Sequence, residues 1–196
     1  MKVNNILIGM ILAAMLLVGC GGGDYTPKPQ AYLRIDMPEH SYTAVDTVAL
    51  PIVFERSVYA DVVTKKLTRQ DVWVDLNYPQ WDGVVFLTYK RLNSPADLRG
   101  QIDTSSRLVE KHYQFASGID EQSFDSDDGT VHAATWHLKG NKVASTYQFY
   151  ATDSTHNFLR GALYLNRTPN NDSLAPVLEY IQEDIEHLVE TLRWRQ

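Results

Sequence analysis

The six histidines are the side chains of this sequence with the widest chemical range, because imidazole binds metals and transfers protons near neutral pH. A zinc site needs ligands that converge, often a close pair and a more distant third residue. His132 and His137 lie five residues apart on one predicted strand and therefore point to opposite faces. Neither His112 nor His187 has a histidine or an acidic residue four positions further on. The spacing therefore predicts no metal site for the histidines, which are His40, His112, His132, His137, His156 and His187.

Other familiar catalytic patterns are missing as well. Residues 125–129 read Asp-Ser-Asp-Asp-Gly, which suits a polar hairpin turn, because the third alternating ligand and the distal glutamate of a calcium loop are absent. The chain contains no Gly-x-Ser-x-Gly nucleophile motif and no glycine-rich phosphate loop. The spacing of the carboxylates selects no pair for acid–base work. We predict a protein that is not an enzyme and uses no cofactor, and a hydrolase with an unrecognised site is the alternative.

Cys20 is the single cysteine, so neither a disulfide within the chain nor a cysteine-based zinc site is possible. It follows an apolar run over residues 6–18, which as a helix would be roughly 20 Å long, too short for a bilayer core of about 30 Å. The run ends in Leu17-Val18-Gly19-Cys20, which resembles the lipobox of bacterial lipoproteins. We predict cleavage between Gly19 and Cys20 and acylation of Cys20 with diacylglycerol and a further chain such as palmitate. An ordinary secretory signal or a single-pass anchor is the alternative.

These features divide the chain into three expected parts. Residues 1–19 form a signal peptide, residues 20–30 a lipidated tether, and residues 31–196 one domain. The tether contains three consecutive glycines and two prolines, so it is expected to be flexible and extended. Glycine rather than aspartate follows Cys20, so the familiar enterobacterial signal for inner-membrane retention is missing. We expect the protein in the cell envelope, held by its lipid on the outer membrane and facing the periplasm.

Composition is consistent with a single folded domain behind the tether. Of the 196 residues, 44% are hydrophobic and 11% aromatic, which is ample for a core. The chain has 18 Lys and Arg against 24 Asp and Glu, and its net charge is −6. No excess of cations is present to neutralise phosphates, so nucleic acid is not an expected partner.

The periodicity of apolar residues predicts an α+β fold. Alternation over residues 72–78 predicts a strand, and residues 84–90 are its expected partner. Ser94-Pro95-Ala96-Asp97 predicts the start of a helix, because a hydroxyl cap, a first-position proline and an early acid favour that end. Its expected apolar face comprises Leu98, Ile102, Val109 and Tyr113. Weaker strand signals cover residues 31–35, 51–54 and 59–63.

A second group of strands and a last helix are expected in the C-terminal half. Asp128-Gly129 and Gly140-Asn141 predict two-residue hairpin turns. They would join strands ending near Phe124, over residues 130–138 and over 142–150, and a fourth strand would cover 158–166. The last helix has an apolar face of Leu174, Val177, Leu178, Ile181, Ile185, Leu188 and Leu192. Its expected caps are Asp172 and Ser173, and Pro176 is expected in its first turn.

This order of elements favours a single antiparallel β-sheet covered by two main helices. It also resembles the PsbP/Mog1-like fold of extracytoplasmic accessory proteins. On the last helix, Glu179, Glu183, Glu186 and Glu190 fall within about 60° of one another, opposite the apolar face. The simplest interpretation is a solvated face, and the alternative is a docking stripe for a basic partner.

A series of short strings follows in order along the expected mature chain. They are Cys20-Gly21, residues 25–29, residues 32–35, Pro38, residues 77–79, residues 87–90, residues 148–154, residues 158–164, residues 169–174 and residues 191–194. Together they resemble the gliding-motility lipoprotein family GldD of the Bacteroidota. The resemblance implies a role in gliding motility and in the type IX secretion apparatus that supports it, with no established reaction. It also implies two kinds of partner, the membrane through the lipid anchor and other envelope motility or secretion proteins.

Two further expectations follow from the sequence. Three short Asp-Ser/Thr sequences resemble the periplasmic O-glycosylation sequence of this phylum, with Thr47, Ser154 and Ser173 as acceptors. The leading functional hypothesis is a non-catalytic accessory or assembly subunit of the motility or secretion machinery. The alternative is a periplasmic lipoprotein that binds a small hydrophobic ligand between sheet and helices, in a pocket lined by Trp73, Trp81 or Trp136.

Overall fold

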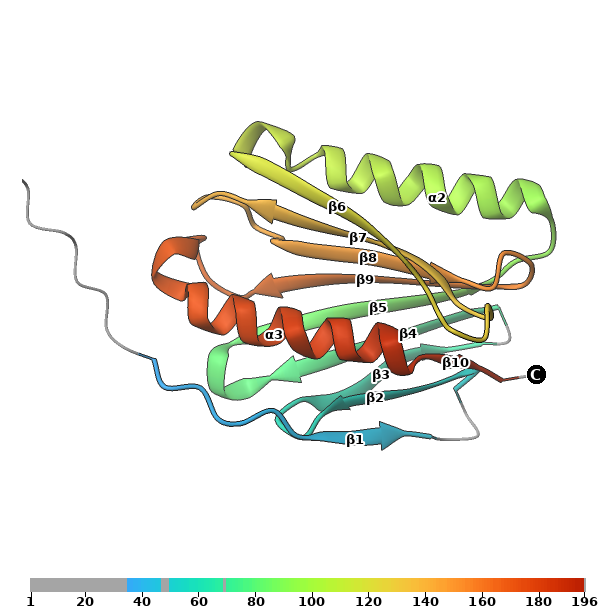
Figure 1. The fold of residues 1–196 in the computed structure, drawn as a ribbon, viewed down its shortest axis with the longest axis horizontal. Coiled ribbons are helices and arrows are strands. Elements are labelled where there is room, and N and C mark those ends of the chain that lie inside the picture. Colours follow the sequence, from blue (N-terminus) through green and yellow to red (C-terminus); the bar gives the residue numbers. More distant parts are fainter. Residues whose placement is uncertain (1–34, 47–49, 69, 196) are drawn as a thin grey trace, which may run out of the picture. The chain divides into compact units, whose positions relative to one another are not determined.

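The computed structural model describes residues 35–46, 50–68 and 70–195, and these form one α+β domain (Figure 1). Its large antiparallel sheet has seven strands. In spatial order they are β3 (Asp61–Leu67), β4 (Asp71–Tyr78), β5 (Gly83–Arg91), β9 (Asn157–Leu165), β8 (Tyr147–Thr152), β7 (His132–Lys139) and β6 (Gly118–Asp125). A small antiparallel sheet contains β1 (Tyr42–Val45), β2 (Ile52–Ser57) and β10 (Arg193–Trp194).

Two long helices, α2 (Pro95–Glu110) and α3 (Asn171–Thr191), cover opposite faces of the large sheet (Figure 1). Val109 of α2 packs in one cluster with Ala134 and Trp136 of β7, whereas Ala133 belongs to the cluster that contains α3. Successive strand residues point to opposite faces, so the two clusters lie on the two sides of the sheet. The predicted antiparallel sheet with two covering helices is therefore confirmed.

The larger hydrophobic cluster lies between α3, the small sheet and one face of the large sheet. Phe149, Leu163 and Ile181 in this cluster have no exposed surface. Leu87 of β5 is paired with Gly161 of β9. A Cβ atom at Gly161 would lie only 1.9 Å from Cε1 of Phe149, so the glycine makes room for that ring. The core is therefore closely packed between β8 and β9.

The predicted central strands and the start of α2 are confirmed. Residues 72–78 and 84–90 lie within β4 and β5, which pair directly. The Ser94 side chain accepts a hydrogen bond from the Asp97 amide at 3.2 Å, with proline at the first helical position. Tyr113 is an exception, because the helix ends at Glu110 and Tyr113 lies in the short 3-10 helix η2 (Tyr113–Phe115), where it is 52% exposed.

The expected start of the last helix was wrong. α3 begins at Asn171, one residue before the predicted caps, so Pro176 lies in its second turn. The cap comes from a distant loop instead, since the Oδ1 atom of Asn141 accepts a hydrogen bond from the Asp172 amide at 3.1 Å. The Asn171 amide also donates to the Asn141 carbonyl at 3.1 Å. The apolar face of α3 was predicted correctly.

The expected two-residue turn at Gly140-Asn141 was also wrong. β8 begins at Tyr147, so residues 140–146 form a longer loop in place of the strand predicted from 142. The loop is held from outside, because Nδ2 of Asn171 donates to the carbonyls of Gly140 and Val143 at 2.7 and 2.9 Å. Val143 is buried against α2, which draws the loop away from a tight hairpin.

Other strand boundaries differ less from the predicted ones. The strand predicted at 59–63 begins at Asp61, because the Ala60 amide donates to the Ser57 carbonyl and forms a turn. Of the strand predicted at 31–35, residues 31–34 lie outside the described residues, and Ile35 is not in a strand. The strand β10 and the separate small sheet were not predicted. No helix among the described residues is long and apolar enough to cross a bilayer.

Candidate functional site

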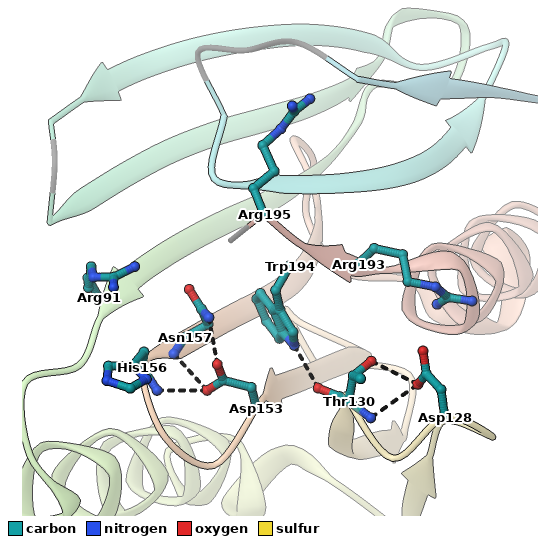
Figure 2. A pocket seen from close by; sticks show the side chains of 9 residues that line it. All are labelled: Arg91, Asp128, Thr130, Asp153, His156, Asn157, Arg193, Trp194 and Arg195. Carbon is teal, nitrogen blue, oxygen red and sulfur yellow. Dashed lines mark hydrogen bonds between the residues drawn. The ribbon is translucent and has the colours of Figure 1, made fainter.

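A pocket of about 550 Å³ lies where two hairpins of the large sheet meet the C-terminal strand β10 (Figure 2). We call it the arginine pocket. Its volume is typical of sites for small molecules. The pocket combines three guanidinium groups, two carboxylates, one imidazole and one indole ring. The residues that line it are Arg91, Asp128, Thr130, Asp153, His156, Asn157, Arg193, Trp194 and Arg195.

Asp153 shapes the hairpin between β8 and β9. Its Oδ1 atom accepts hydrogen bonds from the amides of Thr155, His156 and Asn157 at 2.8 to 2.9 Å. Its Oδ2 atom accepts a further bond from Nδ2 of Asn157 at 2.6 Å. Burial raises the pKa of Asp153, but the backbone hydrogen bonds outweigh burial, so the net shift is downward. The carboxylate is therefore ionised at neutral pH and serves its own loop.

Asp128 accepts hydrogen bonds within the hairpin between β6 and β7 and so stabilises it. Its Oδ1 atom accepts bonds from the Ser126 hydroxyl at 2.7 Å and from the amide and hydroxyl of Thr130 at 3.1 and 2.8 Å. These bonds, that from Ser126 foremost, lower the pKa of Asp128 to about 2. Gly129 adopts a φ of +66°, which a non-glycine residue would adopt only with strain. The predicted polar hairpin is confirmed at this position, but residues 126–131 form its loop and β7 begins at His132, so the expected two-residue turn at Asp128-Gly129 was wrong.

The three arginines reach the pocket from different sides (Figure 2). Arg91 ends β5, whereas Arg193 and Arg195 flank Trp194 in the C-terminal segment. Arg193 donates through Nη1 to the carbonyls of Glu190 and Leu192, and Arg195 pairs through Nη2 with Asp46. The Nε atom of Arg195 is buried and has no hydrogen-bond partner among the described residues.

Trp194 forms the central wall of the pocket. Its indole Nε1 donates a 2.9 Å hydrogen bond to the carbonyl of Thr130, which fixes the ring against the hairpin between β6 and β7 (Figure 2). Its strand β10 pairs with β2, with Trp194 opposite Ile52. No local pattern in the sequence predicts that these residues line one pocket, because they come from four segments far apart in the chain. The closely spaced Arg-Trp-Arg triplet at 193–195 was the local signal that could have indicated them.

A second polar cluster is buried beneath α3, around Asp184. Asp184 is 2% exposed, and its two oxygens contact Nδ1 of His40 at 2.8 Å and the hydroxyl of Tyr78 at 3.1 Å. The other ring nitrogen of His40, Nε2, lies 2.8 Å from Glu183. Burial raises the pKa of Asp184, although its hydrogen bonds act in the opposite direction. Burial, together with the charge of Asp184, also raises the pKa of Tyr78.

Aromatic stacking extends this cluster. The His40 ring stacks on Tyr180 with centroids 4.0 Å apart, and Tyr42 stacks on His187 at 3.6 Å. His187 in turn contacts Glu55 of β2 at 2.7 Å. These contacts hold the segment before β1, and β1 itself, against α3. Both ring nitrogens of His40 face carboxylates, so we interpret the cluster as a clasp and not as a proton-transfer site.

Three of the four predicted glutamates face solvent. Glu179, Glu183 and Glu190 are exposed, and Glu183 also contacts His40. Glu186 is half-buried and accepts hydrogen bonds from the Tyr147 hydroxyl at 3.1 Å and from Gln182 at 2.9 Å. The predicted helical spacing is confirmed, but Glu183 and Glu186 also contact residues outside α3.

The three tryptophans of the hydrophobic-pocket hypothesis lie in different surroundings. Trp73 is 46% exposed on the outer side of β4, and Trp136 is buried in the α2 cluster. Trp81 packs edge-on against Tyr180 at 4.9 Å. These positions give no common ligand pocket, so they do not favour the hypothesis.

The other predicted site residues are placed as follows. Gly19, Cys20 and Thr47 lie outside the described residues. Ser154 is exposed in the hairpin between β8 and β9, where its φ is +63°. Ser173 lies in the first turn of α3. No group of three His, Cys, Asp or Glu side chains within the described part of the chain is arranged to hold a metal ion.

Comparison with known proteins gives one family. The family model described as "Gliding motility lipoprotein GldD" matches residues 22–194. This match covers the described residues as far as Trp194 and agrees with the resemblance found in the sequence. A search of curated proteins found no match.

Proposed function

The chain belongs to the family of gliding motility lipoproteins GldD, and from this premise we propose that it is a non-catalytic accessory or assembly subunit of the gliding-motility or type IX secretion machinery. The observation that carries the proposal is the family match over residues 22–194, which begins two residues after Cys20. Lipid on Cys20 would hold the domain on the outer membrane, facing the periplasm. The domain would contact other envelope proteins of the same machinery.

The anchor supports this role on energetic grounds. Each buried methylene contributes about 0.8 kcal/mol to membrane binding, so two or three acyl chains on Cys20 would bind a bilayer very stably. Confinement to one membrane raises the effective concentration of partners on that membrane. A modest interface on the folded domain would then be sufficient for assembly.

The polar clusters support a structural role for the titratable side chains. Asp128 and Asp153 hold their own hairpins, and Asp184 is engaged by His40 and Tyr78. A general base needs a free acceptor directed at a substrate proton. These carboxylates are instead committed to internal hydrogen bonds, which favours a binding or assembly role over catalysis.

The proposal is tested by complementation of a strain that lacks the protein. The wild type and Cys20→Ser would be expressed with the same tag, and both would be labelled with an alkyne analogue of palmitate. We expect only the wild type to incorporate the label, to fractionate with the outer membrane, and to restore surface spreading or protein export. Full function of unlabelled Cys20→Ser would refute the role of the anchor. Normal spreading and normal export in the strain without the protein would refute the proposed role in the machinery.

A further inference from the structure

We propose that the arginine pocket binds a small solute that bears a phosphate or a carboxylate group. This inference goes beyond the proposed function and does not depend on it. It rests on the size of the pocket, on the guanidinium groups around it, and on the way in which the nearby carboxylates are engaged.

The carboxylates of the pocket are directed toward their own hairpins (Figure 2). All four short bonds to Asp153 come from residues 155–157, and all three bonds to Asp128 come from Ser126 and Thr130. Neutral donors within each loop therefore occupy the carboxylate oxygens, although both groups keep their negative charge. A ligand anion would meet carboxylates that are already hydrogen-bonded.

The guanidinium groups retain capacity for a ligand. A guanidinium carries five N–H donors in a planar fork that suits the oxygens of carboxylate and phosphate. The Arg195 side chain lines the pocket and is 30% exposed, although its Nη2 contacts Asp46 and its Nε is buried. Arg91 is exposed on the opposite side of the pocket.

The remaining surface of the pocket sets the size of the ligand. Trp194 offers an aromatic wall that is fixed by its bond to Thr130. His156 lies at the exposed rim and would add positive charge when protonated. A volume of about 550 Å³ admits more than a bare ion. The ligand would therefore carry its anionic group on a small body that packs against the indole ring.

The test is isothermal titration of the full-length protein in detergent micelles. Three probes would be used separately, namely inorganic phosphate, citrate and glycerophosphoglycerol, the headgroup of an anionic phospholipid. Sodium chloride at matched ionic strength would measure non-specific screening. The variants would be Arg91→Gln, Arg195→Gln and the control Arg99→Gln, which removes an exposed arginine of α2 that does not line the pocket.

We expect at least one probe to bind wild type and Arg99→Gln with the same affinity, and to bind Arg91→Gln roughly tenfold more weakly, the loss equivalent to about 1.4 kcal/mol. Arg195→Gln should weaken binding at least as much. Preference for glycerophosphoglycerol would assign a lipid headgroup as the source, and preference for phosphate or citrate would assign a soluble solute. Heats no larger than those of sodium chloride, or an equal loss in Arg99→Gln, would overturn the proposal. Because Arg91 is exposed at a strand end, its variant remains informative even if Arg195→Gln does not fold.

Discussion

Replacement of His40 by alanine tests whether the clasp on α3 stabilises the domain. His40 contacts the buried Asp184 at 2.8 Å and stacks on Tyr180 at 4.0 Å. A hydrogen bond to a charged group contributes about 1.5–3 kcal/mol. Loss of His40 would leave one oxygen of the buried Asp184 without this contact, while Tyr78 still donates to the other. An aromatic stack adds about 0.5–1.5 kcal/mol. His40 is about a quarter exposed, so we expect His40→Ala to lower the free energy of unfolding by about 2–3 kcal/mol.

The chain contains a matched control for this change. His132 contacts Asp125 at 2.7 Å, but the two side chains are 43% and 74% exposed. An ion pair in such surroundings contributes about 0–1 kcal/mol, because water screens it and ordering both side chains is unfavourable. His132→Ala should therefore have a much smaller effect, although the contact has nearly the same length.

Equilibrium unfolding in urea would measure both variants beside the wild type. The midpoint should fall clearly for His40→Ala and little for His132→Ala, with unchanged slopes. Limited proteolysis should cut the segment before β1 faster in His40→Ala, since that segment would lose its contact with Asp184. Equal midpoints for the two variants would refute the reasoning that burial of the carboxylate makes the clasp strong.

Three further predictions concern packing, capping and pH. Gly161→Ala should destabilise the domain by about 2 kcal/mol or more in urea unfolding, because its Cβ would overlap a buried ring, whereas Gly100→Ala in open space on α2 should stabilise it by up to about 1 kcal/mol. Asn141→Ala should lower the free energy of unfolding by about 1 kcal/mol and Asn170→Ala by less, because only the Asn141 side chain caps an amide of α3. Equal free energies of unfolding for the two variants would contradict the cap by Asn141. The pKa of Asp184 is raised on folding, so the wild type should lose stability as the pH rises from about 4 through that pKa. Asp184→Asn should remove this loss, and urea unfolding across the pH range would contradict the prediction if both proteins show the same decline.

The parts of the fold predicted correctly are those with a regular local pattern. β4 alternates apolar and polar residues over 74–78, and α3 repeats apolar residues at three- and four-residue spacing. The Ser94 cap was also predicted because its partner is only three residues away. In each case, residues close together in the sequence determine the local structure.

The errors occurred where a distant segment determines local structure. The first turn of α3 is capped by Asn141, and the loop over 140–146 is held by Asn171. Neither interaction leaves a local pattern. The strand β10 forms because two residues pair with β2, which lies about 140 positions earlier. Such short tertiary pairing is not recognisable from propensity alone.

The candidate sites were hidden for the same reason. The arginine pocket gathers side chains from β5, two hairpins and β10, and no single segment contains more than a part of it. Asp184 sits between the buried residues Ile181 and Ile185, so its burial follows from helical spacing, but its partner His40 lies 144 positions away. The sequence did indicate Cys20, because a lipid-attachment site is recognised as a linear motif.

The central claim is that this lipoprotein works by contact with other envelope proteins of the motility or secretion machinery. The most direct measurement is crosslinking in intact cells, followed by purification through a C-terminal tag and identification of the attached proteins. We expect motility or secretion subunits to be recovered with the wild type and depleted with Cys20→Ser at equal protein levels. Recovery of no such subunit, in a strain that contains the machinery, would contradict the claim.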